Sequence, residues 1–492
     1  MRSHWSVRVA AAFLVFAPTA AAAQIGSADF AARRDSLARR IGDGVVIAFG
    51  ARTPVTDFGP PTQLPAFHYL TGFDEPDAAF VMVVHKGAGT TTLFTMPIDP
   101  RVAMYYGRRP DSAAIATGFG IPARPFAALR SALDSLAGSG LQFYSLADFE
   151  DADFAHADSL TRGRAFVQAF AAAHGGLTVK DAHPMVNQLR ARKSPAELAL
   201  LRKAAALSVE GHRAAMRLAA PGLHEYDLQA AAEYEFRRGG SLRPPYGSIV
   251  GSGENGTQLH YMLDRGPLRA GDLVVIDAAG EYEGYAADVT RTLPVSGTFT
   301  KEQRVLYQLV RDAQDAAVRN AKPGMKFSVA QDSSLAVRAR GLAQMGLIES
   351  ADALYDPPGK VSCSARPAAC RQVNVWTIHG ISHGLGLAVH DPAQFYSGDG
   401  TVQPGDVFTI EPGIYINTVF LDILPDTPRN RAFIAKVRPV AERLNHTGVR
   451  IEDDYIATPT GLEWISQAPR EASEVEAEMR VAGDTAPRRQ RR

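Results

Sequence analysis

The sequence is poor in cysteine, carries no net charge and has no long hydrophobic run. Its 492 residues include two cysteines, which alone make a poor metal site. Basic and acidic residues balance at 52 each, so nothing in the composition favours nucleic acid or an anionic membrane as a partner. No apolar run, at the N-terminus or later, approaches the roughly 20 residues of a transmembrane helix. What remains is a globular protein whose length predicts two domains, or three.

The N-terminus has the pattern of a secretory signal peptide. Arg2, His4 and Arg8 form a positive region, an apolar stretch follows at residues 9–17, and Ala21, Ala22 and Ala23 supply the small residues of a cleavage site. We therefore expect residues 1–23 to be removed, with cleavage near Ala23. The mature protein would begin near Gln24 and would be periplasmic or secreted, since no cysteine follows to take a lipid.

Export bears on the two cysteines, Cys363 and Cys370, which lie in a loop rich in proline and alanine. An oxidising compartment favours disulfides between neighbouring cysteines. We expect a local disulfide here rather than two free thiols.

Residues 24–185 have the mixed pattern of a separate α/β domain. A helix is expected at 27–40 and 125–137 and again at 161–173, and strands are expected at 44–49, 80–85 and 91–97. The stretch carries no catalytic constellation. We interpret residues 24–185 as an N-terminal domain.

A second domain is expected at residues 190–467. Residues 194–197, SPAE, form a capping box with proline at the first helical position, which predicts the start of a long helix. That helix ends at Pro221-Gly222 and a second follows at 225–238. Helices at 301–321 and 328–345, separated by Pro323-Gly324, repeat the arrangement. We interpret this as an internal duplication with a site between its halves, although coincidence explains it equally well.

The stretch from 271 to 292 predicts a β-hairpin with two acids. Strands at 273–279 and 285–292 flank a turn through 281–284, and each strand carries one aspartate, Asp277 or Asp288. A hairpin centred between Tyr282 and Glu283 would place the two opposite each other, with Cβ atoms roughly 4.5–5.5 Å apart. Their neighbours are apolar, so unpaired carboxylates would be costly there and a divalent metal is the simplest partner. The alternative is a solvated hairpin end whose acids point to water.

Two glycine-rich segments carry histidines. Residues 251–256, GSGENG, match the dinucleotide pattern GxGxxG, but no long helix follows, so we interpret them as a turn that delivers His260. In HGISHGLGLAVHD, His379, His383 and His390 fall within twelve residues among glycines that disfavour a helix. The HExxH motif is absent, so a helical single-zinc site is not expected.

Two further segments each present an acid. A strand ends at Glu411, and Pro412 fixes the backbone beyond it. In VRIEDD, residues 449–454, alternation places Arg450 and Glu452 on one face of a strand, away from the apolar residues between them. Each acid alone would be read as a surface residue, but together these segments form a set.

The set resembles the metal-binding signature of the pita-bread metallopeptidases. The motif contexts IDAAGEYEGYAADVTR, HGISHGLGLAVHD, IEPGIY and RIEDD carry the resemblance, and KSPAELALLRKAAALSVEGHRAAM and YLTGFDEPDAAFVMVV are similar to the aminopeptidase P and prolidase branch. The resemblance implies an α+β protein with a C-terminal pita-bread (creatinase/aminopeptidase-like) catalytic domain at 190–467 and a smaller N-terminal α/β domain. After that domain, residues 468–492 are expected to be a disordered tail.

The resemblance also implies roles for the residues. Two divalent metal ions would be held by Asp277, Asp288, His383, Glu411 and Glu452, with Asp288 and Glu452 shared between the ions. Two such ions supply four positive charges against four carboxylates, and manganese is expected from the resemblance alone, with cobalt or zinc left open. Glu411 is expected to shuttle protons, His260, His379 and His390 to orient the substrate, and Arg450 to hold the carboxylate of Glu452.

The implied activity is that of an Xaa-Pro aminopeptidase, which hydrolyses the N-terminal Xaa-Pro bond of peptides. The alternatives are an Xaa-Pro dipeptidase (prolidase) and, in another class, a metal-free pita-bread module that binds peptides. Proline-containing peptides are the expected partners, without nucleic acid or a membrane span, and a homo-oligomer is left open. Segments 348–374 and 419–448 are longer than the family pattern, and we interpret them either as surface additions or as walls that narrow the cleft.

Overall fold

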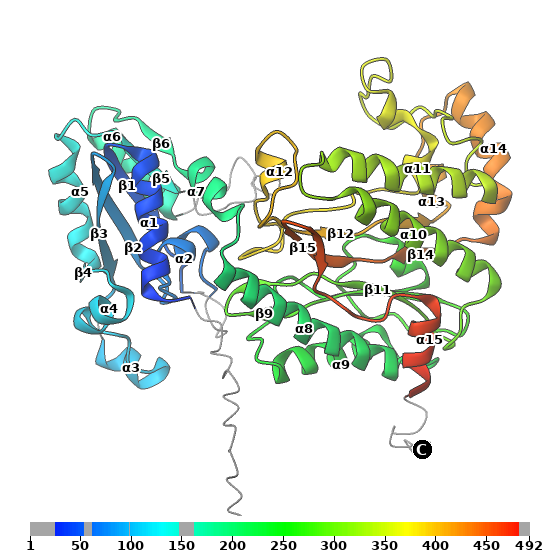
Figure 1. Cartoon of the computed structure of the whole chain (residues 1–492), viewed down its shortest axis with the longest axis horizontal. Coiled ribbons are helices and arrows are strands. Elements are labelled where there is room, and N and C mark those ends of the chain that lie inside the picture. The colour runs from blue at the N-terminus through cyan, green and yellow to red at the C-terminus, as the bar shows by residue number, and fades with distance from the viewer. Residues whose placement is uncertain (1–24, 54–61, 98, 147–161, 482–492) are drawn as a thin grey trace, which may run out of the picture.

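The computed structural model describes residues 25–53, 62–97, 99–146 and 162–481. The expected signal peptide lies outside these residues. Figure 1 shows two bodies side by side, a smaller N-terminal one in blue and cyan and a larger one that runs from green to red. Within the described part of the chain, no helix is both long and apolar enough to cross a bilayer.

The smaller body is built on a six-stranded sheet, with strands in the order β4-β3-β2-β1-β5-β6. The strands are β1 (Gly44–Phe49), β2 (Ala79–His85), β3 (Ala88–Thr95), β4 (Ala123–Pro125), β5 (Phe143–Leu146) and β6 (Val179–Asp181). β2 pairs antiparallel with β1 and β3, whereas β4, β5 and β6 join in parallel. The central strand β1 is buried along its whole length, which explains its continuous apolar sequence GVVIAF.

Helices cover both faces of this sheet. Alternate residues of β1 point to opposite sides: Val46 packs with α1 (Ser27–Ile41), α2 (Pro65–Thr71), α4 (Ser112–Phe119) and α7 (His183–Arg190), and Ile47 packs with α5 (Leu129–Ala137) and α6 (Arg162–Ala173). A short helix, α3 (Pro100–Tyr106), and the turn η1 (Phe126–Ala128) complete the body. The helices and strands predicted here are present within four residues at each end, whereas α2, α3, α4, α7, β4, β5 and β6 were not predicted.

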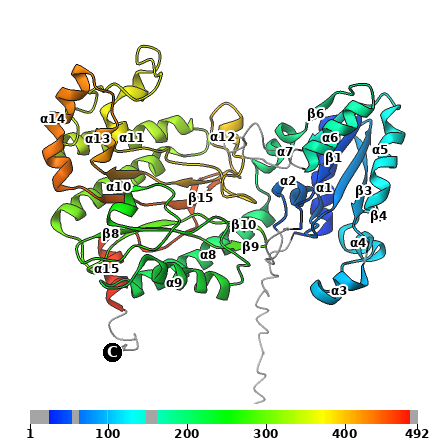
Figure 2. The same ribbon diagram turned by 180° about the vertical axis from the view of Figure 1, so that it is seen from behind.

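The larger body begins with the predicted capping box. Ser194 N donates to the Glu197 carboxylate at 2.9 Å and Glu197 N donates to Ser194 Oγ at 3.3 Å, so the box opens α8 (Pro195–Leu218). The pair α8 and α9 (Glu225–Arg238) lies on one side of the strands, and the pair α10 (Lys301–Asn320) and α11 (Phe327–Met345) lies on the other, in both views (Figures 1 and 2). The strands that carry the candidate residues therefore lie between the two predicted helix pairs.

The hairpin forms, but its predicted register was wrong by two residues. Its strands are β8 (Leu273–Asp277), β9 (Glu281–Tyr282), β10 (Tyr285–Ala286) and β11 (Thr290–Pro294), and β8 also pairs with β7 (Ile249–Ser252). The turn is centred between Glu283 and Gly284, which both take positive φ, 49° and 79°, as a type I′ turn requires. Asp277 is therefore opposite Thr290 rather than Asp288. Because side chains alternate with a period of two, a shift of two residues leaves both aspartates on the same face.

Three further pairings bring the remaining segments to the hairpin. β12 (Val407–Ile410) pairs with β15 (Asp453–Thr458), which pairs with β16 (Gly461–Trp464), and β13 (Gly413–Ile416) pairs with β14 (Thr447–Arg450). Isolated bridges join Thr290 to Glu452 and Gly384 to Phe408. The hairpin, the histidine loop and both acidic strands thus meet at one place.

The two longer segments are structured additions. In the first, Cys363 and Cys370 form the expected disulfide, with Cα atoms 5.7 Å apart, and Cys370 is the last residue of the turn η4 (Pro367–Cys370), which η5 (Gln372–Val375) follows. The second contains α13 (Val419–Asp422) and α14 (Pro428–Arg443), whose Phe433 and Val437 are buried in the main core. This second segment is therefore part of the fold rather than surface decoration.

The prediction of a disordered tail from residue 468 was wrong for part of its length. Residues Ala472–Val481 form the helix α15, which buries Ala472, Val475 and Met479 in the main core. These residues lie at i, i+3 and i+7, so one face of a polar sequence is apolar at helical spacing. Residues 482–492 lie outside the described part.

Buried Arg291 ties the hairpin to the C-terminal segments. Its guanidinium bonds Asp453 Oδ1 at 2.6 Å and the carbonyl oxygens of Ala468 and Pro469, and the residue is fully buried. A matched pair on the surface, Arg202 with Glu463 at 2.6 Å, is more than one-third exposed on both sides.

Arg291→Met should therefore lower the free energy of unfolding by about 3 kcal/mol, because it leaves buried acceptors without a donor. Arg202→Met should cost about 1 kcal/mol or less, because water screens the pair that it removes. Urea unfolding followed by fluorescence compares the two variants. Equal losses would contradict the central role of Arg291.

Candidate active site

One cavity of about 460 Å³ gathers every site residue that the sequence predicted. Nine of the residues that line it are the predicted ones: His260, Asp277, Asp288, His379, His383, His390, Glu411, Arg450 and Glu452. They come from five segments spread over almost two hundred positions. None of the described residues that line the cavity comes from the segments 348–374 or 419–448, so these segments do not form its wall.

The backbone places the acids at breaks between strands. Asp277 ends β8, Glu411 follows β12, and Glu452 separates β14 from β15. Asp288 lies where the hairpin ladder is interrupted, and its N–H donates to Asp454 Oδ2 at 3.1 Å instead of to the neighbouring strand. At such breaks a side chain can leave the plane of the sheet and point into the cavity.

His383 lies at the centre of the acids. Its Nε2 is 3.3 Å from Asp288 Oδ2, 3.8 Å from Glu411 Oε1 and 3.9 Å from Glu452 Oε1. Asp288, His383 and Glu452 can each offer one ligand atom, all within 4.8 Å of one another. That spacing suits a shared cation, with Asp277 and Glu411 at its flanks.

Tyr246 shows how crowded the carboxylates are. Its hydroxyl is 2.8 Å from Asp277 Oδ1 and 2.6 Å from Asp288 Oδ1. A phenol has one proton to donate, so it cannot satisfy both carboxylates when both are ionised. Tyr246 was not predicted, because it lies outside every motif.

Burial and mutual repulsion shift the pKa values of the buried acids. Burial, followed by the charge of Asp277, raises the pKa of Asp288 well above its ordinary 3.8, and burial, followed by Asp288, raises the pKa of Glu452 well above 4.5. Burial would raise the pKa of Glu411, but the hydrogen bond and charge of His379, together with the charges of His383 and Arg450, outweigh it and lower that pKa. The group of oxygen donors with one imidazole therefore fits divalent cations, which would supply the positive charge that these acids lack.

Arg450 bonds a different carboxylate from the one predicted. Its guanidinium donates to Asp277 Oδ2 at 2.8 Å and to Thr290 Oγ1 at 3.2 Å, and Thr290 Oγ1 in turn donates to Glu452 Oε2 at 2.6 Å. The long side chain reaches across β11 to β8, so Arg450 contacts Glu452 only through Thr290. Tyr415, four residues after Glu411, receives a third bond from Arg450, of 2.7 Å, and was not predicted.

The three remaining histidines line different parts of the wall. His379 Nδ1 lies 3.3 Å from Glu411 Oε2 and its Nε2 lies 2.8 Å from the Tyr415 hydroxyl. The His390 ring lies edge-on to His383, with centroids 4.4 Å apart, and His260 is exposed at the cavity surface. The arrangement offers an acid that can take a proton, flanked by imidazoles that can donate one.

Comparisons with known proteins place the chain in one family. The model of metallopeptidase family M24 matches residues 199–459, and that of the aminopeptidase P N-terminal domain matches residues 30–143. The chain is 32% identical to Xaa-Pro aminopeptidase of Escherichia coli over 469 residues, 93% of this chain and 99% of that protein. It is 33% identical to human Xaa-Pro dipeptidase over 316 residues, 60% of this chain and 61% of that protein.

A solved structure is similar over nearly the whole chain. The structure of Escherichia coli aminopeptidase P with the inhibitor Pro-Leu superposes with a TM-score of 0.76 at 30% identity. The match covers 94% of this chain and 100% of that one.

The raised pKa values predict how pH should act on the metal-free protein. Asp288 and Glu452 hold protons more tightly in the folded than in the unfolded chain, so their contribution to stability is full below their ordinary pKa values and is lost as the pH rises through the folded values. With chelator, the melting temperature should fall as the pH rises from about 5 to about 8, and the increase on adding divalent metal should grow over that range.

The control is the double variant Asp288→Asn with Glu452→Gln, which should weaken the dependence, whereas Asp264 and Asp454, whose pKa values burial also raises, still contribute to it. Differential scanning calorimetry measures the melting temperature of both proteins across this pH range, once with chelator and once with metal. A metal effect that is independent of pH in the parent protein would rule out this account.

Proposed function

The chain belongs to metallopeptidase family M24, in its aminopeptidase P branch, and from this premise we propose that it is an Xaa-Pro aminopeptidase. It has the pita-bread fold with the N-terminal domain of that branch, as the sequence predicted. The observation that carries the proposal is the single cavity in which all nine predicted residues meet. The reaction is hydrolysis of the first peptide bond of a peptide whose second residue is proline.

The M24 family implies divalent metal ions, and we propose two, with manganese as the native metal. Asp277 would hold one ion, His383 and Glu411 the other, and Asp288 and Glu452 would be shared by both. Bound there, the ions would supply Lewis acidity toward the scissile carbonyl and toward water. The donor spacing around His383 and the excess of buried carboxylates support this assignment.

The side chains divide the remaining work. Glu411, whose pKa is lowered, is ionised at neutral pH and can take a proton from the attacking water and return it to the leaving nitrogen. His379 is held between Glu411 and Tyr415, so it presents a fixed ring to the substrate. His260 and His390, at the exposed part of the wall, are placed to hold the substrate carbonyl. Arg450 donates to Asp277 Oδ2 and so holds that carboxylate in place.

Proline explains why a dedicated enzyme is needed. The nitrogen of an Xaa-Pro bond carries no hydrogen, and the ring fixes the backbone, so a general peptidase binds it poorly. The cavity wall includes four apolar side chains, Ile249, Leu259, Met262 and Val389. They give a pyrrolidine ring apolar surface beside the polar centre.

The dipeptidase alternative is the weaker one. The match to Xaa-Pro aminopeptidase of Escherichia coli extends over both bodies and 93% of the chain, whereas the match to human Xaa-Pro dipeptidase extends over 60%. The metal-free binding module is disfavoured because all five proposed ligands are present and lie together.

We further propose that the protein is exported. The signal-peptide pattern of residues 1–23 and the disulfide between Cys363 and Cys370 support this location. Mass spectrometry of the protein from fractionated cells should find an N-terminus near Gln24 outside the cytoplasm, and a cytoplasmic protein that retains residues 1–23 would contradict the proposal.

Substrate length separates the proposed activities. The metal-reconstituted enzyme should cleave Xaa-Pro-Yaa and longer peptides with kcat/KM at least about tenfold above that for Xaa-Pro dipeptides, because a dipeptidase must also bind a free carboxylate next to the proline. Liquid chromatography measures the cleavage of each peptide, and metal analysis of the same preparation measures the bound metal. Cleavage of dipeptides alone would establish the dipeptidase, and failure to bind manganese, cobalt or zinc would favour the binding module.

Glu411→Gln should lower kcat by about a hundredfold or more, because the amide cannot take a proton. Glu442→Gln, on the exposed face of α14, is the matched control and should retain full activity. Near-normal turnover of Glu411→Gln would remove Glu411 from the reaction.

A further inference from the structure

The loop that carries His390 is built around a buried carboxylate, that of Asp391. Asp391 N donates to Gly384 O at 2.9 Å, and Ala388 N donates to Asp391 Oδ1 at 3.1 Å, so the loop closes on its own last residue. The side chain of Asp391 is 2% exposed. A buried charge of this kind needs partners of opposite sign.

Those partners come from the segment that joins the two bodies. Arg190, the last residue of α7, donates to Asp391 Oδ1, and Lys193, just before α8, donates to Asp391 Oδ2 at 2.9 Å and to Pro392 O at 3.0 Å. Both cations are as buried as the acid, with side chains 1% exposed. The histidine loop is therefore attached to the connection between the bodies by charges that water does not screen.

The glycines of the loop are explained by the same carboxylate. A Cβ on Gly386 would lie 2.4 Å from Asp391 Oδ2, and one on Gly384 would lie 2.1 Å from Asp391 O. Neither position can accept a side chain unless Asp391 moves. The glycines of HGLGLAVHD thus make room for Asp391.

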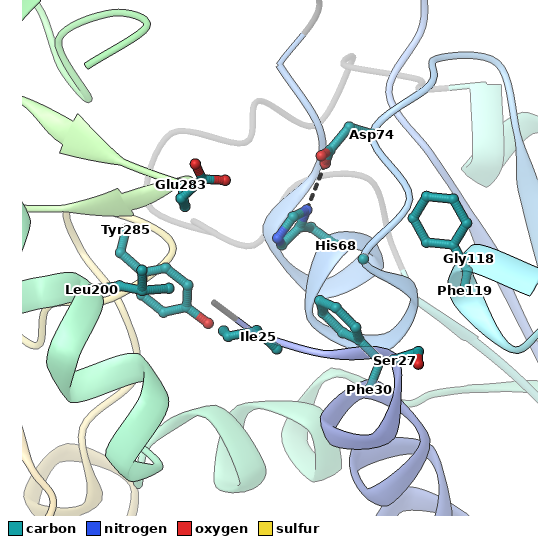
Figure 3. Close-up of a pocket in the computed structure, with 11 residues that line it drawn as sticks. Ile25, Ser27, Phe30, His68, Asp74, Gly118, Phe119, Leu200, Glu283 and Tyr285 are labelled. Carbon is teal, nitrogen blue, oxygen red and sulfur yellow. Dashed lines mark hydrogen bonds and ion pairs between the residues drawn. The ribbon is translucent and has the colours of Figure 1, made fainter. Parts of the chain in front are cut away.

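The loop also contacts the hairpin and the N-terminal body. Gly386 O accepts from Ala286 N of β10 at 2.8 Å, and Leu387 packs against the core that α1 and α2 share with the N-terminal sheet. Nearby, packing is incomplete: Figure 3 shows a pocket, of about 240 Å³, where Glu283 and Tyr285 of the hairpin face His68 and Asp74 of the N-terminal body. The fixed points of this interface are therefore its buried ion pairs.

We propose that Asp391 is a positioning residue that holds His390 in the wall of the active site by anchoring the histidine loop to Arg190 and Lys193. The inference rests on the proposed function. It makes the segment between the bodies part of the active-site geometry, although it lies outside the cavity. It also gives the N-terminal body a role in catalysis, because Arg190 at the end of α7 helps to position the histidine loop.

The test is a double-mutant cycle on the full-length, metal-reconstituted protein. Asp391→Asn keeps the shape of the side chain but removes the charge, and should lower kcat/KM by about tenfold or more through misplacement of His390, with metal content unchanged. In a His390→Ala background the same change should have almost no further effect, because its target is already gone. Equal losses in both backgrounds would overturn the proposal.

Arg33→Met is the matched control. Arg33 forms another buried ion pair between the same bodies, with Glu197 at 3.2 Å, but it does not contact the histidine loop. Its loss should destabilise the protein while kcat/KM stays within about twofold of the parent, and its effect should add to that of His390→Ala. If Arg33→Met lowered kcat/KM as much as Asp391→Asn does, loosening the interface between the bodies would be sufficient to explain the loss, and the specific role of Asp391 would be contradicted.

A readout independent of activity separates this proposal from the proposed function. The rate at which diethyl pyrocarbonate modifies His390 can be measured by mass spectrometry, relative to the rate at exposed His446. This relative rate should change several-fold in Asp391→Asn. If the parent does not cleave Xaa-Pro peptides, the proposed function fails but this measurement still decides the role of Asp391. If Asp391→Asn does not fold, Lys193→Met, which keeps the pair with Arg190, should shift both readouts in the same direction, and an unchanged rate would overturn the proposal.

Discussion

The constraint on which the structure depends is the concentration of acids around His383. Asp277, Asp288, Glu411 and Glu452 share one cavity, and Arg450 is the cation that bonds directly to one of them. Such an arrangement is unfavourable until positive charge enters it. For this reason burial and repulsion raise the pKa values of Asp288 and Glu452 well above their ordinary values. The strand breaks, the hydrogen bonds of Thr290 and Tyr246 and the crossing side chain of Arg450 all serve to hold these acids close together.

The N-terminal body takes part in the same organisation. None of its described residues lies in the cavity wall, yet it packs against Leu387 of the histidine loop, and Arg190 at its end bonds Asp391. Its α1 reaches Tyr285 of the hairpin through Arg33. The histidine loop and the hairpin therefore both contact the first body, the loop through Asp391 and Leu387 and the hairpin through Tyr285.

Much of the fold could be predicted from the sequence because its motifs are local, and the candidate set followed from the resemblance of those motifs to a known family. The capping box of α8, the turn glycines and the strand alternation around Glu452 each act over a few residues, so pattern alone places them. The predictions failed where distant segments decide the outcome. The hairpin register depends on the positive φ of Glu283, the partner of Arg450 depends on which strand lies beside β14, and Tyr246 and Tyr415 reach the acids through folding alone. The helix α15 was missed because its composition is polar, although its apolar face could have been recognised.

Arg291 has a consequence for the order in which the protein becomes competent. The strand that follows Asp288 is held by carbonyl oxygens from residues 468 and 469, and Asp453 is bonded by Arg470 as well. These contacts require residues 453 and 468–470 to be present. A growing polypeptide therefore cannot fix the strand after Asp288 in this way until residue 470 has left the ribosome, so this part of the site is completed late in synthesis.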